Sequence, residues 1–257
     1  MRISLDGKRI LVTGSTQGLG ETIARMALDC GAAAVVITGR NREHGEALAA
    51  TLGPRVTYIA ADLTRVEAPP ALFDAALAAM GGMDGLVNAA GLTTRGSFLD
   101  GRVEDWEELF AVNARAPFLL MQGLIRHLKA EGRPGSIVNI QSVNAICGAP
   151  ELAMYSASKS ALSTLTRNAA NTHLADRIRV NGIDMGWVAT PGEQRMQAEI
   201  LGNGAGWADA AAARMPLGRL LTMEEVATLT LYLLSDISGL QTGTVTWLEQ
   251  SIPGGPR

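Results

Sequence analysis

The sequence is poor in cysteine, in histidine, in aromatic residues and in charge. Aromatic residues make up 4% and charged residues 18% of its 257 residues. Its two cysteines, Cys30 and Cys147, stand at no metal-ligand spacing and offer no disulfide framework, so we expect both to be reduced. The three histidines, His44, His127 and His173, are equally scattered. No metal site is therefore predicted.

Long apolar runs and basic clusters are missing as well. No segment is long enough to cross a bilayer, and the first nine residues lack the apolar core of a signal peptide. With a net charge of −3 and no dense run of Lys or Arg, the chain offers no general attraction to nucleic acid. We therefore expect a cytoplasmic protein that binds neither nucleic acid nor a membrane.

What the sequence does have is a regular alternation of short apolar runs and longer helical stretches. The runs expected as strands are residues 10–12, 34–37, 56–59, 86–87, 137–140, 178–180 and 244–247. Stretches rich in Ala and Leu lie between them, among them 68–80, 103–130 and 154–174. This alternation predicts an α/β fold of the Rossmann type, a doubly wound parallel sheet of about seven strands with helices on both faces.

The organisation of the chain predicts one domain, residues 1–257, because no linker or repeat divides it. Residues from about 190 to 216 interrupt the rhythm of strands and helices and contain Asn203-Gly204-Ala205-Gly206. A long excursion inside a compact domain is usually functional or mobile. We interpret this segment as a lid over a substrate pocket.

A glycine-rich turn follows the first expected strand and precedes a helix. It reads Thr13-Gly14-Ser15-Thr16-Gln17-Gly18-Leu19-Gly20. Glycines permit a tight turn and let a phosphate approach the backbone, and the helix N-terminus supplies unpaired N–H donors. Because 29 glycines make close triples common, the motif gains its force from the strand and helix around it. It predicts a site for a dinucleotide pyrophosphate.

The end of the second strand, Thr38-Gly39-Arg40, is expected to contact the adenosine ribose of that dinucleotide. An acidic residue there would bind the 2′-hydroxyl of NAD and repel a 2′-phosphate. Arg40 can instead pair with a phosphate through its planar guanidinium. We therefore favour NADP(H) as the cofactor. NAD(H) stays possible if Arg40 stacks on the adenine or faces solvent.

A tyrosine and a lysine stand four residues apart in Tyr155-Ser156-Ala157-Ser158-Lys159. On a helix the two side chains share one face. A phenol holds its proton too tightly to act as a base near neutrality, but a nearby ammonium and a positively charged nicotinamide would lower its pKa. The pair therefore predicts proton transfer at the oxygen of an alcohol or ketone, accompanied by hydride transfer at its carbon.

Together these motifs resemble those of the short-chain dehydrogenase/reductase family, and the likeness runs over nearly the whole chain. The matching motifs are Thr13-Gly14-x-x-x-Gly18-x-Gly20, Asp62-Leu63, Asn88-Ala89-Ala90-Gly91, Asn113, Ser142 and Tyr155-x-x-x-Lys159. The resemblance implies a catalytic tetrad of Asn113, Ser142, Tyr155 and Lys159. In it Ser142 holds the substrate oxygen, Lys159 also holds the nicotinamide ribose, and Asn113 anchors a water in a proton relay.

The resemblance, together with Arg40, also implies which residues contact the cofactor. They are Gly14, Ser15, Thr16, Gln17, Gly18, Leu19, Gly20, Arg40, Asp62, Leu63, Asn88, Ala89, Gly91, Tyr155, Lys159, Gly186, Val188 and Thr190. Two positions depart from the family pattern. Gln17 stands where members that prefer NADP often carry a basic residue, and Met185 replaces the proline that usually precedes Gly186.

The predicted function is interconversion of a secondary alcohol and a ketone by an NAD(P)(H)-dependent oxidoreductase acting on a small molecule. The substrate is expected to contact Ser142, Asn144, Glu151, Tyr155 and Trp187. Asn144 and Glu151 can hydrogen-bond several hydroxyls, which suggests a polyol or sugar-like substrate. The family resemblance implies a homotetramer, with a dimer as the alternative.

Two other functions are compatible with the sequence. A 3-oxoacyl-carrier-protein reductase would need a basic surface for an acidic carrier, to which Arg95, Arg102, Arg195 and Arg214 could contribute. A non-catalytic dinucleotide-binding protein could share the fold. The presence of both Tyr155 and Lys159 argues against the second alternative.

Overall fold

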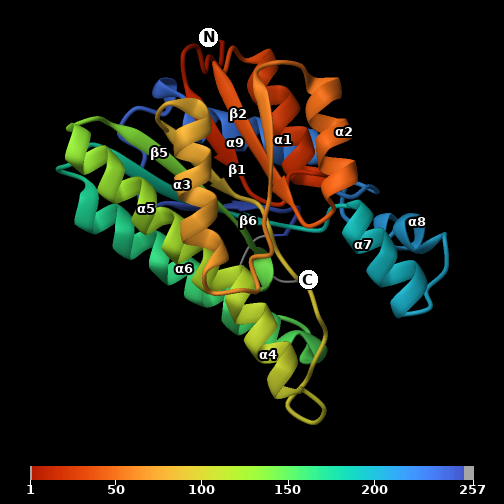
Figure 1. Cartoon of the computed structure of the whole chain (residues 1–257). Coiled ribbons are helices and arrows are strands. Elements are labelled where there is room, and N and C mark those ends of the chain that lie inside the picture. Colours follow the sequence, from red (N-terminus) through yellow and green to blue (C-terminus); the bar gives the residue numbers. More distant parts are fainter. Residues whose placement is uncertain (1, 252–257) are drawn as a thin grey trace.

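The centre of the protein is a parallel sheet, seen in a computed structural model that describes residues 2–251 (Figure 1). Its seven strands are β1 (Arg9–Val12), β2 (Ala34–Gly39), β3 (Val56–Ala60), β4 (Gly85–Asn88), β5 (Gly135–Ser142), β6 (Ile178–Met185) and β7 (Val245–Leu248). They pair in parallel in the order β3-β2-β1-β4-β5-β6-β7. Each predicted run overlaps one of these strands, and the predicted fold class is confirmed.

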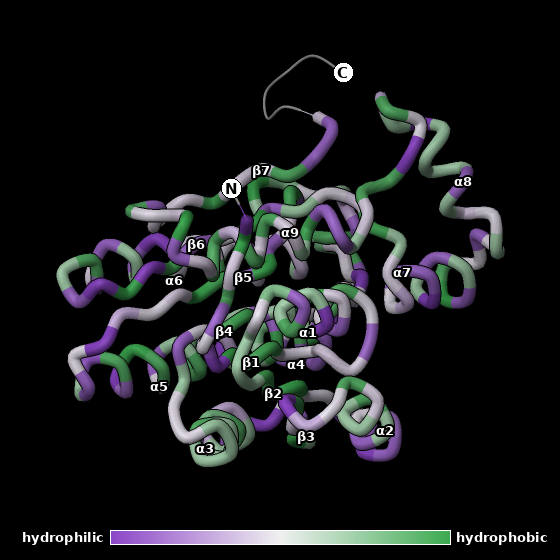
Figure 2. The backbone as a smooth tube through the Cα atoms, turned by 90° about the horizontal axis from the view of Figure 1, so that it is seen from above, coloured by the Kyte–Doolittle hydropathy of each residue, from purple (hydrophilic) through white to green (hydrophobic). Residues whose placement is uncertain are grey.

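Helices cover both faces of the sheet, which Figure 2 shows from above as a row of strands between two layers. One layer holds α1 (Gly18–Asp29), α2 (Arg42–Leu52) and α9 (Met223–Leu234), and the other holds α3 (Ala68–Met80), α5 (Ala116–Glu131) and α6 (Ala153–His173). The helix predicted over 103–130 consists of α4 (Val103–Phe110), the π-helical segment η1 (Ala111–Arg115) and α5.

The core lies in two halves because each central strand buries side chains on both faces. Ile10 and Val12 of β1 belong to the half beneath α1 and α9, whereas Leu11 belongs to the half beneath α3 and α5. All three side chains are fully buried. Continuous apolar runs are what a parallel sheet covered on both faces requires, which is why the strands were recognisable from sequence.

The strand order reverses between β1 and β4, and this reversal positions the site. The chain builds β1, β2 and β3 towards one edge and then returns to place β4 on the other side of β1. The turns after β1 and β4 therefore meet. The hydroxyl of Thr13 accepts hydrogen bonds from the N–H groups of Ala89 and Ala90, both at 3.1 Å. Ligands of open α/β sheets bind at such a switch point.

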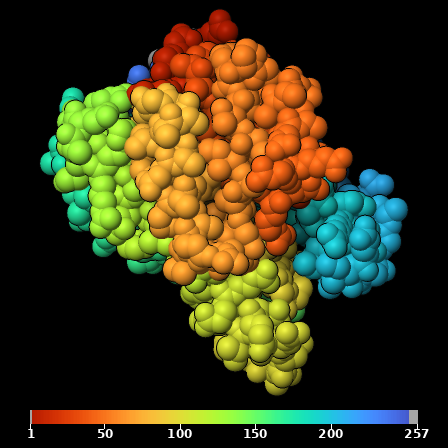
Figure 3. Space-filling view, viewed as in Figure 1, coloured from red at the N-terminus to blue at the C-terminus, as the bar shows by residue number. Residues whose placement is uncertain are grey.

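Two segments project from this body (Figures 1 and 3). The predicted lid forms one of them and contains α7 (Pro191–Arg195), the π-helical segment η4 (Met196–Ile200) and α8 (Trp207–Ala212). The other consists of residues 92–102 and the beginning of α4. Short 3₁₀ turns complete the structure: η2 (Val143–Ala145), η3 (Pro150–Leu152) and η5 (Asp236–Ser238).

Candidate active site

A large cavity runs along the carboxyl ends of the strands and continues beneath the lid. Its volume is about 1280 Å³, more than a single drug-sized ligand needs. Most of the predicted site residues line it: Gly14, Thr16, Gln17, Gly18, Leu19, Gly20, Arg40, Asp62, Leu63, Ala89, Gly91, Ser142, Asn144, Glu151, Tyr155, Lys159, Gly186, Trp187, Val188 and Thr190. The other three, Ser15, Asn88 and Asn113, are buried at 1% exposure or less.

Two of these buried residues hold the cavity wall together. The hydroxyl of Ser15 donates to the carbonyl of Val12 at 2.6 Å and accepts from the N–H of Thr38 at 3.0 Å, which ties the glycine turn to β2. The side chain of Asn88 donates to the side-chain oxygen of Asn139 at 2.8 Å, which ties β4 to β5. Direct contact of Ser15 and Asn88 with a cofactor stays a prediction.

The glycine turn presents bare backbone to the cavity. Gly14 has a φ of +62°, and a Cβ there would lie 2.7 Å from the Cα of Ala90. A Cβ at Gly20 would lie 2.3 Å from the carbonyl oxygen of Gly14. Helix α1 begins at Gly18, so its unpaired N–H groups face this space. A backbone cradle at a helix N-terminus fits a pyrophosphate.

The adenosine end of the cavity combines a restricted turn with a free cation. A Cβ at Gly39 would lie 2.4 Å from the hydroxyl of Thr16, so only glycine allows β2 to pass this close to the glycine turn. Arg40 is exposed, and among the described residues its guanidinium has no hydrogen-bond partner. Hydrogen bonds from Thr64, with Arg40 nearby, hold the pKa of Asp62 below its usual value.

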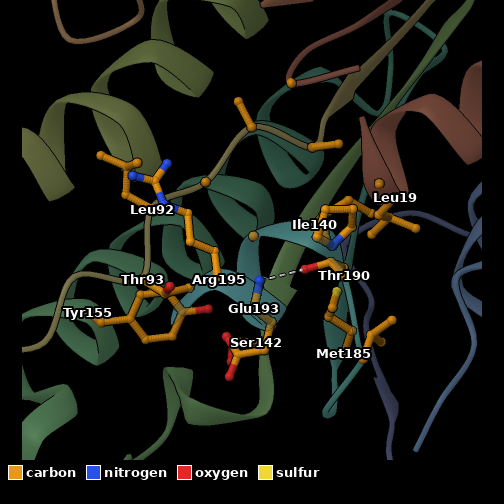
Figure 4. A pocket seen from close by; sticks show the side chains of 18 of the residues that line it. Leu19, Leu92, Thr93, Ile140, Ser142, Tyr155, Met185, Thr190, Glu193 and Arg195 are labelled. Atoms are coloured by element: carbon orange, nitrogen blue, oxygen red, sulfur yellow. Dashed lines mark hydrogen bonds between the residues drawn. The ribbon is translucent and has the colours of Figure 1, made fainter. Parts of the chain in front are cut away.

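The predicted catalytic side chains converge where β5 meets α6. Tyr155 and Lys159 lie one turn apart on α6, and the Lys159 Nζ is 5.9 Å from the centre of the Tyr155 ring. That Nζ donates to the carbonyl of Ile140 at 3.0 Å, just before Ser142 at the end of β5. Figure 4 shows Tyr155 and Ser142 facing the same space. The arrangement can hold one substrate oxygen between two hydroxyls.

Asn113 sits behind this group in the π-helical segment η1. Its side-chain oxygen accepts from the N–H of Leu92 at 2.9 Å, and its amide donates to Ser158 at 3.0 Å. A Cβ placed on Gly91 would lie 3.3 Å from the Lys159 Nζ and 3.6 Å from the Asn113 oxygen. Lysine and asparagine therefore face one small space beside Gly91, as a proton relay requires.

Burial controls the ionisation of the catalytic pair. It raises the pKa of Tyr155, although a hydrogen bond from Ser142 and the charge of Arg95 act in the opposite direction. It lowers the pKa of Lys159 to about 8, while Asp184 acts to raise it. In the chain without cofactor, desolvation of the phenolate outweighs the neighbouring groups that favour it, and lowering of the phenol pKa by Lys159 together with the nicotinamide charge stays a prediction.

Trp187 and the segment predicted as a lid contribute another part of the cavity wall. The indole N–H of Trp187 donates to the Glu193 carboxylate at 2.9 Å, and Gln197 donates to the same oxygen at 2.7 Å. The ring of Trp187 packs at 5.6 Å against that of Trp207, which is 4% exposed. Both tryptophans line the cavity. The N-cap hydrogen bond from the Glu193 N–H to Thr190, drawn in Figure 4, begins α7 at the cavity edge.

Met185 ends β6 and is followed by Gly186, where the family usually has proline before glycine. In this chain the C-terminal segment packs against Gly186. A Cβ at Gly186 would lie 1.8 Å from a carboxylate oxygen of Glu249. The N–H of Gly186 donates to Leu248 at 2.8 Å, and the N–H of Trp187 donates to Glu249 at 3.2 Å. Gly186 therefore leaves room for the Glu249 carboxylate, and the C-terminal segment reaches the cavity beside it.

Sequence reasoning missed several residues that line the cavity, above all Glu193 and Glu249. Neither belongs to a motif, and their convergence depends on how helix α7 and the segment after β7 fold against the sheet. Of the four arginines considered for carrier recognition, Arg95, Arg195 and Arg214 do line the cavity. Arg102 does not belong to this group, because it is 68% exposed and pairs with Glu104.

Within residues 2–251, His, Cys, Asp and Glu side chains form no cluster of three that could hold a metal ion. No helix in the same range is long and apolar enough to span a bilayer.

Comparison with known proteins shows close relatives over almost the whole chain. A family model described as enoyl-(acyl carrier protein) reductase matches residues 14–250. The chain is 37% identical over 200 residues to a 2-dehydro-3-deoxy-D-gluconate 5-dehydrogenase of Escherichia coli K12, covering 76% of this chain and 78% of the relative. It is 33% identical over 249 residues to a 3-oxoacyl-[acyl-carrier-protein] reductase of Aquifex aeolicus, covering 95% and 97%. A solved structure titled short chain dehydrogenase/reductase family protein matches with a TM-score of 0.84 and 35% identity, over 96% and 98% of the two chains.

Proposed function

The chain belongs to the short-chain dehydrogenase/reductase family, and we propose that it uses NADP(H) to interconvert the alcohol and ketone of a polyol-like substrate. Family membership makes it an oxidoreductase acting on CH–OH groups, which interconverts secondary alcohols and ketones. The observation that carries the catalytic part of the proposal is the convergence of Ser142, Tyr155 and Lys159 on one cavity with the glycine turn.

The residues of this chain divide the chemistry between proton transfer and binding. The bare backbone of the glycine turn would hold the pyrophosphate, and the bound cofactor would supply or accept the hydride. Ser142 donates a hydrogen bond to the substrate oxygen, and Tyr155 gives that oxygen a proton during reduction or takes it during oxidation. Lys159 and Asn113 then exchange the proton with solvent through the space beside Gly91.

A test of this proposal is activity against a panel of carbonyl compounds with NADPH and NADH. We expect Tyr155→Phe to lower kcat/KM by about 100-fold or more, because the variant cannot donate the proton. Tyr232→Phe on α9 is the matched control, since Tyr232 does not line the cavity. A Tyr155→Phe enzyme with wild-type activity would refute the assigned role of this residue.

Preference for NADP(H) over NAD(H) is supported by the free guanidinium of Arg40 at the adenosine end of the cavity. We expect Arg40→Gln to weaken NADPH binding about 10- to 100-fold and NADH binding less than about 3-fold, because only NADPH carries the 2′-phosphate. Calorimetric titration measures both affinities. The control is Arg42→Gln, since Arg42 is 73% exposed and pairs with Glu46. Equal losses for the two cofactors would contradict the preference.

A polyol or sugar-like substrate is supported by the polar groups on the substrate side of the cavity. Asn144, Glu151 and Trp187 all line it, as does Glu193 from the lid. The Escherichia coli relative is named for a sugar acid. Reduction of a carrier-bound 3-oxoacyl group is the second candidate, favoured by the Aquifex relative and by the arginines at the cavity. Rates on carrier-bound and free substrates separate the two.

We propose that residues 1–257 form a single catalytic domain in which residues 190–216 are a substrate lid. A homotetramer is the first choice for the assembly and a dimer the second, supported by exposed apolar side chains on α4 and α5, among them Trp106 and Phe118. The cytoplasm is the proposed location, supported by two cysteines that are both free.

A further inference from the structure

We propose that Arg95 makes this active site selective for substrates that carry a carboxylate in addition to the reacting alcohol or ketone. The inference rests on the proposed function, because it concerns the substrate of the same site. Arg95 belongs to the projecting segment 92–102 and lines the cavity together with Ser142 and Tyr155. Its side chain is 20% exposed. A guanidinium this strongly buried in a substrate cavity needs a partner.

The structure gives the Arg95 guanidinium too few partners of its own. Its Nε is buried and has no hydrogen-bond partner. The nearest carboxylate is that of Glu193, whose Oε1 lies 3.8 Å from an Arg95 terminal nitrogen, beyond hydrogen-bonding distance. That oxygen already accepts from Trp187 at 2.9 Å and from Gln197 at 2.7 Å. The guanidinium therefore keeps donors to offer to a ligand.

The position of Arg95 connects these donors to the reacting centre. Its charge lowers the pKa of Tyr155, which places the guanidinium within electrostatic reach of the phenol. Glu193 acts on the same phenol in the opposite direction. Figure 4 shows Glu193 beside Tyr155 and Ser142, and the same carboxylate lies 3.8 Å from Arg95 of the projecting segment. A substrate whose reacting oxygen contacts Tyr155 can thus place a second anionic group on Arg95.

Among the functional groups of a polyol-like molecule, a carboxylate suits these donors best. The guanidinium fork matches the two oxygens of a carboxylate, and its charge offsets the repulsion from Glu193. Arg195 and Arg214 add positive charge to the same cavity. Arg195 is 75% exposed and Arg214 donates to the carbonyl of Ala210, whereas Arg95 is the arginine of the three whose charge acts on the Tyr155 phenol.

The test compares carboxylates with their uncharged primary amides. The probes are 4-oxocyclohexanecarboxylate and three aldonates, each paired with its amide, assayed with NADP(H) and NAD(H). We expect the wild-type enzyme to favour at least one acid over its amide by about 10- to 100-fold in kcat/KM, mainly through KM. Arg95→Gln is expected to bring this ratio close to one, by losing activity on the acid while activity on the amide changes less than about 3-fold.

Two further variants separate recognition from folding. Arg95→Lys keeps the charge without the planar fork, so its ratio should lie between those of wild type and Arg95→Gln. Arg102→Gln is the matched control, because Arg102 belongs to the same segment but pairs with Glu104 outside the cavity. If Arg95→Gln fails to fold, the wild-type ratio and that of Arg95→Lys decide the question.

These results separate failure of the carboxylate inference from failure of the proposed oxidoreductase function. Equal use of acid and amide by the wild-type enzyme, or an equal loss on both in Arg95→Gln, would overturn the carboxylate inference and leave the function standing. Turnover of neutral ketones without turnover of any acid would overturn it as well. Failure to turn over any carbonyl compound with either cofactor would instead count against the proposed function.

Discussion

Asp184 is a buried carboxyl group that belongs to no motif and yet influences the catalytic pair. It lies on β6 with 5% exposure, and its Oδ1 has no hydrogen-bond partner. Burial raises its pKa to about 6, although Arg167 and Lys159 oppose the shift. Its charge acts to raise the pKa of both Tyr155 and Lys159. The pKa values of Tyr155 and Lys159 therefore depend partly on Asp184, a buried group outside the sequence motifs.

This influence predicts the direction in which Asp184→Asn moves the pH profile. Without the carboxylate the pKa values of Tyr155 and Lys159 both fall, so the phenolate needed for alcohol oxidation forms at lower pH. We expect the acid limb of kcat/KM for oxidation to move to lower pH in this variant. Asp74→Asn, at an exposed position of α3, is the control. Superimposable profiles for Asp184→Asn and wild type would show that Asp184 has no such influence.

The same variant has a stability readout that does not depend on activity. The pKa of Asp184 in the folded chain, about 6, lies above its ordinary value of 3.8. Its contribution to stability is therefore fully present below pH 3.8 and is lost as pH rises through about 6. Asp184→Asn should gain stability relative to wild type between about pH 4 and pH 7 in denaturant unfolding. A stability difference that stays flat over this range would contradict the assignment.

Among single residues, those that belong to sequence motifs could be predicted. Which residues from distant segments meet in the cavity could not. Tyr155 and Lys159 were recognisable because a helix fixes their relative positions. Arg95 comes from the projecting segment 92–102 and Glu193 from helix α7, so no spacing in the sequence brings them together. Asp184 was missed because an apolar strand with one acidic residue does not show which face that residue occupies.

Among the structural elements, the first turn of α1 depends most directly on one residue type. A Cβ at Gly20 would lie 2.3 Å from the Gly14 carbonyl oxygen and 2.8 Å from the Ser15 Cα, both rigid backbone atoms. Gly20→Ala must therefore push α1 away from the turn. We expect a loss of roughly 1–3 kcal/mol in unfolding free energy and at least about a 10-fold loss of NADPH affinity.

The matched control is Gly206→Ala in the lid. Gly206 has a φ of −84°, and a Cβ there would meet no atom within 4 Å. The unfolding free energy of the Gly206→Ala variant should stay within about 0.5 kcal/mol of the wild-type value. Chemical denaturation and cofactor titration of both variants test this contrast. If Gly20→Ala behaved like Gly206→Ala, the close approach of α1 to the glycine turn would be unnecessary for binding.

Regular elements could be predicted from sequence better than interrupted ones. The seven strands followed from their apolar runs, and α3 was predicted with its observed bounds, 68–80. The π-helical segment η1 left no trace in the pattern, because it depends on Asn113 turning inwards to bond Leu92. Short helices in the lid were also missed, since their packing relies on the contact between Trp187 and Trp207.

At the scale of the whole molecule, strand order joins the two halves of the site. The turn after β1 binds the turn after β4 through Thr13, although 76 residues separate Thr13 from Ala89. The same sheet edge carries Ser142 at the end of β5, with Tyr155 on the following helix. Cofactor cradle and proton donor therefore share one cavity. We therefore expect hydride and proton to reach the same substrate from these two sides.

The most direct test follows deuterium from the cofactor to the product in a single turnover. The cofactor is NADPH deuterated at the carbon that transfers hydride, and the substrate is a ketone. We expect the wild-type enzyme to form an alcohol one mass unit heavier than the alcohol formed with unlabelled NADPH. Tyr155→Phe keeps the aromatic ring and should still bind NADPH, yet form this product about 100-fold more slowly or worse. Equally fast deuterium transfer by Tyr155→Phe would contradict the account.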